Sequence, residues 1–256
     1  MQQDIVIFAP HQDDEILGAY EIIRQQPEHT YVVFLTNGDY EGAEVAKTRW
    51  HESRKALTHL GVPEDHMIAL GYADTGMPRE VSFLWRLWHE SDQTLVPSHV
   101  GAHTYHPDGG KEYHLAHWGA HAAYTRLAVL ADVRGVLEDI RPGTIYVTNE
   151  DDVHGDHAAA PLFVRAAIDQ MADYTPTIYR YHVHGGDDER WPNRTGDVFE
   201  KPLNLDESQW QSRVSVPVDD QKNFLETLES FQSQWRDAEY MTAFIKKEQI
   251  FYREKK

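Results

Sequence analysis

Apolar runs alternate with helical patterns along the first half of the chain. Residues 5–8, 31–36, 66–71 and 144–148 are mostly apolar and rich in β-branched or aromatic side chains, which is typical of buried strands. Residues 16–25 and 44–60 have helical spacing, and Gly61 and Pro63 mark the end of the second helix. Strands that alternate with helices indicate a parallel sheet. The pattern therefore predicts an α/β fold with a Rossmann-like, mostly parallel sheet and helices on both faces.

The later elements are expected within the same domain. The pattern predicts helices at 81–89, 119–140, 158–172, 220–235 and 240–252, and strands at 177–183 and 212–218. The polar segment 185–204 is interpreted as an excursion within the domain, so residues 1–256 form a single domain. Residues 92–118 are irregular and rich in Gly, Pro and His, and we expect them to act as a lid over the site.

Two of the predicted strands end in clusters of histidine and acidic residues. The first cluster reads His11-Gln12-Asp13-Asp14-Glu15, and the second ends in His154-Gly155-Asp156-His157. Acids at the start of a helix are also typical N-caps, which is the alternative interpretation of the first cluster. Capping explains one or two acids, but it does not explain a histidine beside three acids. Both clusters are therefore interpreted as parts of a site.

The two clusters together offer a set of metal ligands. The carboxyl ends of parallel strands share one edge of the sheet, so the clusters can converge there. His11, Asp14 and His157 form a His₂-carboxylate set that leaves an open coordination position, as catalytic zinc sites do. The chain has no cysteine, so imidazole and carboxylate groups must hold any metal. We expect one Zn²⁺ per chain, although other divalent transition metals accept the same ligands.

A second group of histidines lies between residues 99 and 121. Its members are His99, His103, His106, His114, His117 and His121. The last three can share one helical face, which raises the alternative of a second metal site. A wet or partly packed face is the commoner explanation of such a pattern.

Charge and hydropathy limit the classes of partner. The formal net charge is −18, from 42 acidic and 24 basic residues, which disfavours binding to nucleic acid or to an anionic bilayer. No stretch reaches the roughly 18 apolar residues of a membrane span, and no secretory leader precedes the first strand. We therefore expect a cytoplasmic protein. The first strand is not followed by Gly-x-Gly-x-x-Gly, which disfavours a nicotinamide or flavin cofactor.

The paired clusters resemble the signature of the PIG-L, or LmbE-like, zinc-dependent de-N-acetylases. The resemblance extends from the first strand to about residue 175. It implies an LmbE-like fold, with zinc held by His11, Asp14 and His157. It also implies that Asp13 acts as the general base, that His154, if protonated, stabilises the oxyanion, and that Asp156 orients a site histidine.

The resemblance also implies three substrate contacts and shows two departures. Asp39, Arg49 and Asp74 stand where family members contact the sugar. Gln12 and Gly155 occupy positions that are commonly proline in the family. Since glycine frees the backbone that proline would stiffen, the placement of His154 is less constrained than that of His157.

The function that we infer from the sequence is zinc-dependent removal of an N-acetyl or other N-acyl group. The substrate is expected to be a glucosamine-containing small molecule or glycan. Two alternatives stay open: a metal-dependent phosphoesterase, which would usually need two metal ions or abundant basic residues, and a non-catalytic sugar-binding protein on the same fold. The sequence does not indicate an oligomeric state.

Overall fold

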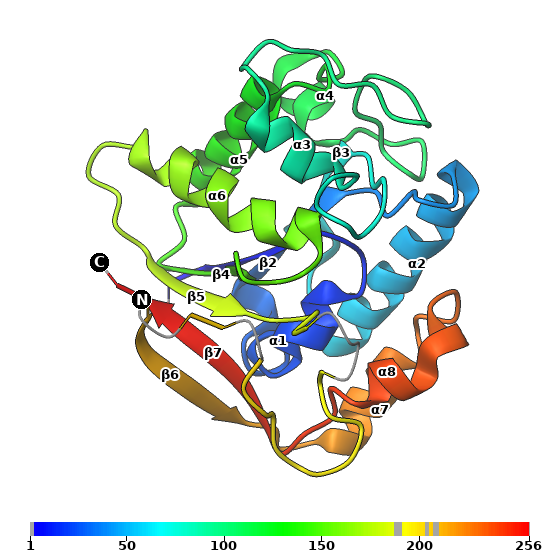
Figure 1. The fold of residues 1–256 in the computed structure, drawn as a ribbon, viewed down its shortest axis with the longest axis vertical. Helices are drawn as coiled ribbons and strands as arrows, with labels where there is room; N and C mark the ends of the chain where they lie inside the picture. Colours follow the sequence, from blue (N-terminus) through cyan, green and yellow to red (C-terminus); the bar gives the residue numbers. More distant parts are fainter. Residues whose placement is uncertain (1–2, 187–190, 203–204, 207–209, 256) are drawn as a thin grey trace.

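The computed structural model describes residues 3–186, 191–202, 205–206 and 210–255, and its centre is a sheet of seven strands (Figure 1). The strands are β1 (Ile5–Ala9), β2 (Thr30–Thr36), β3 (Met67–Tyr72), β4 (Thr144–Thr148), β5 (Thr177–Tyr181), β6 (Trp210–Pro217) and β7 (Glu248–Glu254). They lie in the order β3-β2-β1-β4-β5-β7-β6.

The sheet is mostly parallel, as predicted. Strands β1 to β5 pair with their neighbours in parallel, and β7 and β6 extend the β5 edge in antiparallel fashion. β1 lies between β2 and β4, so the direction in which strands are added reverses between β1 and β4. In open α/β sheets such a reversal opens a crevice at the carboxyl ends of the strands. The two polar clusters follow β1 and β4, on the two sides of this crevice.

Helices cover both faces of the sheet, which confirms the predicted architecture (Figure 1). One face packs against α1 (Asp14–Gln25), α2 (Ala43–Leu60), α7 (Gln221–Leu228) and α8 (Ala238–Thr242). The other packs against α3 (Phe83–His89), α5 (Arg126–Ile140) and α6 (Gly155–Asp169), while α4 (Tyr113–Trp118) lies near β3. Buried side chains such as Tyr20 and Phe224 form the first core, and Phe83 and Phe163 belong to the second.

The predicted helix at 240–252 is wrong. α8 ends at Thr242, and Glu248–Glu254 form β7 between β5 and β6. Phe251 and Tyr252 are buried there. Pairing with strands on both sides and burial of these aromatic rings favour the strand over the weak helical spacing.

Two other predicted helices are too long. The stretch 119–140 contains only α5, because Gly119 ends α4 in a left-handed conformation (φ 82°) and α5 begins after Thr125, whose side chain accepts from the Ala128 amide. The stretch 220–235 contains α7, which ends at Leu228. Within the predicted excursion 185–204, residues 187–190 and 203–204 lie outside the described residues.

Hydrogen bonds hold segment 92–118 against the ends of β2 and β3. The Asn37 side chain donates to the carbonyl oxygen of Tyr105 (2.9 Å), and the Tyr105 hydroxyl donates to Asp39 (2.7 Å). The role of this segment as a lid stays a prediction. Three histidines in or just after this segment face separate carboxylates: His114 contacts Asp132 at 2.7 Å, His117 contacts Asp139 at 3.4 Å, and His121 contacts Glu112 at 3.0 Å. This arrangement favours the interpretation as a partly packed face and not as a second metal site.

Among the described residues, no helix combines the length and apolar character needed to cross a bilayer.

Gly18 sets the distance between α1 and β5. A Cβ atom at this position would lie 2.2 Å from the ring of Tyr181, whose hydroxyl donates to the Phe8 carbonyl. We expect Gly18→Ala to destabilise the protein by about 1–3 kcal/mol, because a buried ring would have to move. Thermal or urea denaturation measures this. Gly110→Ala is the matched control, since its new methyl group would make only ordinary contacts, the nearest at 3.5 Å. Equal stability of the two variants would contradict the argument.

Candidate metal centre

The turn between β1 and α1 brings the first polar cluster to the edge of the sheet. Asp13 precedes the first residue of α1 and has φ 109°, a conformation that costs energy for a residue other than glycine. Its side chain makes no capping hydrogen bond, so the capping interpretation does not hold for Asp13. Glu15 instead accepts the Asp13 amide at 2.8 Å and the Ser53 hydroxyl at 2.7 Å. These bonds hold the turn while the Asp13 carboxylate remains in the cavity.

The turn between β4 and α6 holds the second cluster. His154 caps α6, because its Nδ1 accepts the Asp156 amide at 3.2 Å. The buried Asp152 carboxylate accepts the His154 amide at 2.9 Å. Both the main chain and the ring of His154 are therefore fixed by hydrogen bonds.

Three predicted ligands converge on one point. His11 Nδ1 lies 3.1 Å from His157 Nε2 and 3.3 Å from Asp14 Oδ2, and His157 Nε2 lies 3.1 Å from the same oxygen. All three side chains are buried. Ligands at 2.0–2.1 Å around a tetrahedral zinc ion are roughly 3.3 Å apart, so the triangle has the size of one face of such a site.

The other nitrogen of each imidazole faces a buried carboxylate. His11 Nε2 lies 3.2 Å from Asp156 Oδ2, and His157 Nδ1 lies 3.2 Å from Asp152 Oδ2. A carboxylate accepts, so these nitrogens carry the protons of the neutral rings, and the lone pairs of the remaining nitrogens point into the triangle. The same carboxylate–histidine pairing orients metal-bound histidines.

The centre attracts positive charge. Burial alone would lower the pKa of His157, but the Asp14 and Asp152 carboxylates raise it to about 9. Burial likewise opposes the charging of His11, yet Asp74 and the other nearby carboxylates raise its pKa well above the ordinary value. A divalent ion supplies this charge and displaces the protons. The donor set therefore fits a transition-metal ion. His154 also offers a ring nitrogen within 4.8 Å of the ligand atoms of His11 and His157.

Asp13 lies beside the triangle and does not belong to it. Its Oδ2 lies 3.4 Å from Arg49, and its side chain lines the same cavity of about 250 Å³ as His11 and Asp14. Burial raises the pKa of Asp13 to about 7, although the Arg49 guanidinium opposes the shift. A carboxyl group with a pKa near neutrality can exchange protons at the working pH.

The His154 ring presents a proton donor to the same cavity. Burial, together with the neighbouring His11 and His157 rings, keeps the pKa of His154 well below its ordinary value. The ring is therefore neutral. Because Nδ1 accepts the Asp156 amide, the proton of the neutral ring is on Nε2. His154 can therefore donate a hydrogen bond from the neutral ring, without the protonation that the sequence analysis named as a condition.

The three predicted substrate contacts occupy different positions. Arg49 and Asp74 line both the central cavity and a larger one of about 780 Å³. Asp39 is buried behind them, and its carboxylate accepts the Asp74 amide at 2.6 Å and the Tyr105 hydroxyl at 2.7 Å. The structure thus brings Arg49 and Asp74 to the centre, whereas Asp39 supports the loop that carries Asp74.

Sequence reasoning missed three residues at the centre. Asp152 orients His157, while His184 and Tyr240 line the central cavity. His184 follows β5, so the rule that site residues lie at the carboxyl ends of parallel strands could have found it. Asp152 stood among similar acids in the second cluster, and nothing local distinguishes Tyr240.

Gly155 has a structural reason for replacing the usual proline. Its amide donates to the Met77 carbonyl at 2.9 Å, a bond that proline cannot make. A Cβ atom would lie 2.4 Å from Ser82 Cβ and 2.8 Å from Arg79 Cα. Glycine therefore fixes this turn through close packing. The other departure, Gln12, is also buried, and its side chain donates to the Thr36 carbonyl at 3.0 Å.

Comparison with known proteins agrees with this geometry. Residues 6–168 match the family model of PIG-L, described as GlcNAc-PI de-N-acetylase. The chain belongs to the PIG-L family. No curated protein matches the sequence. The PIG-L match contains both polar clusters and ends one residue before the end of α6, so the C-terminal part of the chain lies outside it.

Solved structures share the fold of this PIG-L chain at low sequence identity. The N,N'-diacetylchitobiose deacetylase of Pyrococcus horikoshii is 14% identical, with a TM-score of 0.56 over 98% of this chain and 83% of that one. The zinc-inhibited form of teicoplanin deacetylase is 12% identical, with a TM-score of 0.59 over 98% and 97%. The 4-carboxy-2-hydroxymuconate hydratase of Pseudomonas putida KT2440 is 13% identical, with a TM-score of 0.53 over 94% and 83%. The presence of a hydratase shows that the fold alone does not fix the activity.

The carboxylates behind the two histidines should control metal affinity. We expect the protein to bind one Zn²⁺ per chain, and Asp152→Asn to weaken binding by about 10- to 100-fold, because the amide no longer holds the His157 tautomer. Isothermal titration calorimetry on metal-free protein measures this. Asp132→Asn is the matched control, since Asp132 forms a buried pair with His114 away from the centre. Wild-type affinity in Asp152→Asn would contradict the proposed role of this carboxylate.

Proposed function

We propose that the protein is a zinc-dependent N-deacetylase acting on an N-acetylated amino sugar, either a small molecule or a glycan containing glucosamine. The observation that carries the proposal is the triangle of His11, Asp14 and His157 with Asp13 and His154 beside it. Membership of a de-N-acetylase family supports a hydrolytic N-deacetylase. The deacetylases among the similar structures support the same activity.

His11, Asp14 and His157 would hold the ion. When bound, zinc supplies Lewis-acid chemistry that polarises a carbonyl group and acidifies water. Asp156 and Asp152 hold the two imidazoles in the tautomers that bind a cation. The remaining steps are carried out by side chains that line the same cavity.

Asp13 acts as the general base and then as the general acid. It accepts a proton from the attacking water and returns it to the departing amine, which converts the amide into a carboxylate and a free amine. Burial raises the pKa of this carboxyl group in the protein without a bound ion, which favours proton exchange. The nearby Arg49 holds the carboxylate in place.

His154 stabilises the negative charge that develops on the acyl oxygen. The neutral ring donates from Nε2, and its orientation is fixed before substrate binds by the Asp156 amide. A preorganised donor in a water-poor site stabilises an oxyanion without reorganisation during the reaction. Arg49 and Asp74 contact the sugar hydroxyls, and Asp39 supports Asp74 from behind.

The alternatives from the sequence predict different measurements. A phosphoesterase would hold two metal ions and release phosphate, and a sugar-binding protein would bind without turnover. The hydratase among the similar structures adds a third activity on this fold, in which no amide bond is cleaved. Release of acetate together with a free amine distinguishes the deacetylase from all three.

A panel of N-acetylated sugars, including N-acetylglucosamine and N,N'-diacetylchitobiose, tests the proposal. We expect acetate release that a chelator abolishes and one equivalent of Zn²⁺ restores, because the ligand triangle holds a single ion. The assay quantifies acetate and free amine in equal amounts. Absence of turnover across the panel with zinc-loaded protein, or full activity of metal-free protein, would overturn the proposal.

Two variants test proton transfer and oxyanion stabilisation without removing a proposed metal ligand. We expect Asp13→Asn to lower kcat by about 10²- to 10⁴-fold and His154→Ala by about 10²- to 10³-fold, because the first loses the base and the second loses the donor. Zinc content should stay at one per chain in both. The exposed carboxylate of Asp139 provides the control variant Asp139→Asn, which should keep wild-type kcat. Loss of zinc from His154→Ala would instead make His154 a ligand.

A further inference from the structure

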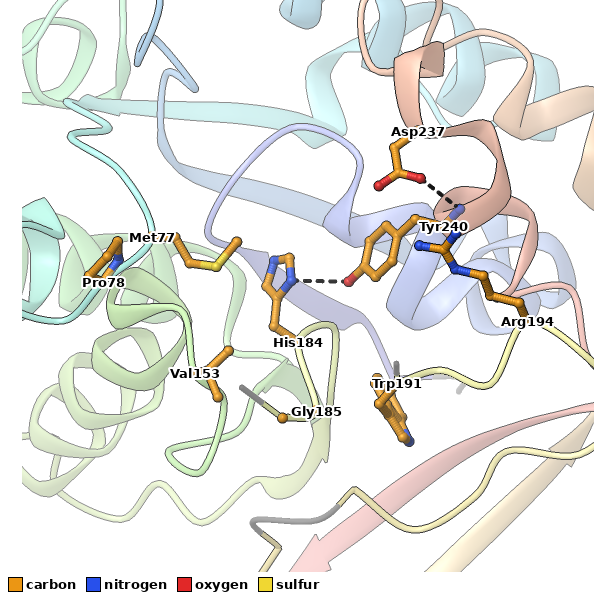
Figure 2. Close-up of a pocket in the computed structure, with 10 residues that line it drawn as sticks. Met77, Pro78, Val153, His184, Gly185, Trp191, Arg194, Asp237 and Tyr240 are labelled. Carbon is orange, nitrogen blue, oxygen red and sulfur yellow. Dashed lines mark hydrogen bonds between the residues drawn. The ribbon is translucent and has the colours of Figure 1, made fainter. Parts of the chain in front are cut away.

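A second pocket adjoins the metal centre on the side of α8. It has a volume of about 390 Å³, and its walls include Met77, Val153, His184, Trp191, Asp237 and Tyr240 (Figure 2). Met77, His184, Asp237 and Tyr240 also line the central cavity. A group bound in this pocket would therefore lie directly beside the reacting atoms.

Much of the wall of this pocket is hydrocarbon, and several of its polar groups also bond to other parts of the protein. The Tyr240 hydroxyl donates to the Val183 carbonyl and contacts His184 Nδ1 at 3.0 Å. Arg194 pairs with Glu239 at 2.7 Å. Asp237 accepts the Tyr240 amide at 3.1 Å, as Figure 2 shows. Met77, Pro78, Val153 and Trp191 supply the apolar surface.

A larger cavity also adjoins the centre, and it carries more charged and hydrogen-bonding side chains than the first pocket, beside apolar residues such as Val45 and Val81. Its volume is about 780 Å³, and its walls include Arg49, Asp74, Gln234 and the ion pair between Arg236 and Glu41 (2.8 Å). Groups of this kind suit a ligand with many hydroxyls. Met77 lines this cavity, the central cavity and the apolar pocket, so its side chain lies where the three spaces meet.

The two substituents of the scissile amide can be assigned to the two cavities beside the centre. The amide unit is planar and trans, so the amine and acyl substituents leave the C–N bond in opposite directions. We assign the hydroxylated amine substituent to the larger cavity, which leaves the apolar pocket for the acyl substituent. A methyl group is close in size to a water molecule, which occupies about 30 Å³ in the liquid. An acetyl group would thus leave most of the 390 Å³ unfilled.

We propose that the apolar pocket binds the acyl chain, and that the enzyme prefers amino sugars whose N-acyl group is longer than acetyl. The proposal rests on the N-deacetylase activity proposed above and names the class of acyl group that this activity accepts. Hydrolysis forms a C–O bond from one water, breaks the amide C–N bond, and releases a medium-chain carboxylate and the protonated amine. Trp191 and Val153 are specificity-determining residues, since they line this pocket and not the central cavity.

N-acetyl-, N-butanoyl- and N-hexanoylglucosamine form the test series. Zinc-loaded protein is assayed for free amine, and kcat/KM is compared along the series. We expect kcat/KM to rise by roughly threefold for each added methylene that is buried, and by at least about tenfold from acetyl to hexanoyl.

Trp191→Ala should lower the ratio of kcat/KM for the hexanoyl to the acetyl substrate by at least about tenfold, because it removes an apolar wall. Trp191 also packs against Phe199 and Phe244. Val153→Phe, which fills the pocket and leaves that packing intact, provides a second variant and should lower the same ratio. Trp118→Ala changes a tryptophan that is 45% exposed on α4, and it should leave the ratio unchanged.

The outcomes separate the two proposals. Hydrolysis of N-acetylglucosamine with kcat/KM falling along the series would overturn the acyl pocket and leave the deacetylase proposal intact. Absence of turnover for every member would overturn both. Octyl N-acetylglucosaminide gives a further comparison: if it is preferred over N-acetylglucosamine and Trp191→Ala abolishes that preference, the pocket binds the group on the anomeric carbon and the acyl assignment is wrong.

Discussion

Two imidazole nitrogens and a carboxylate oxygen lie within 3.3 Å of one another in the interior of this protein. Electron pairs at that spacing repel unless a proton or a metal ion lies among them. Hydrogen bonds to Asp156 and Asp152 keep the His11 and His157 rings in this arrangement. The folded protein therefore favours a positive charge at this point even without a bound ligand. The position of Asp13, His154 and the surrounding cavities follows from where that charge is held.

The topology explains why these residues meet although they are more than 140 positions apart in the chain. β1 and β4 are neighbours at the point where the strand order reverses, and each continues directly into a turn and a helix. A parallel sheet aligns the carboxyl ends of its strands, so side chains from both turns face one crevice. The strained backbone of Asp13 and the tight turn at Gly155 are local costs of directing these side chains inward.

The sequence predicted an element or a site residue correctly where a local pattern of apolar and polar residues determines both its burial and its place in the sheet. Continuous apolar runs predicted the parallel strands, and the polar residues after two of them predicted that His11, Asp14 and His157 lie together. β7 was missed because the run around Phe251 is short and its burial depends on strands on both sides. Asp152 and Tyr240 were missed because their roles depend on contacts with His157 and His184 that sequence spacing does not encode.

The hydrogen bond from the Gly155 amide to the Met77 carbonyl links the catalytic turn to the walls of the substrate cavities. His154 lies in this turn, and Met77 lines both the apolar pocket and the larger cavity. A displacement of Met77 would therefore disturb the turn that positions the His154 ring. Trp191, Gln234 and Tyr240 line these spaces and lie beyond residue 168, where the family match ends. The match thus contains His11, Asp14 and His157 but only part of the walls that would contact a substrate.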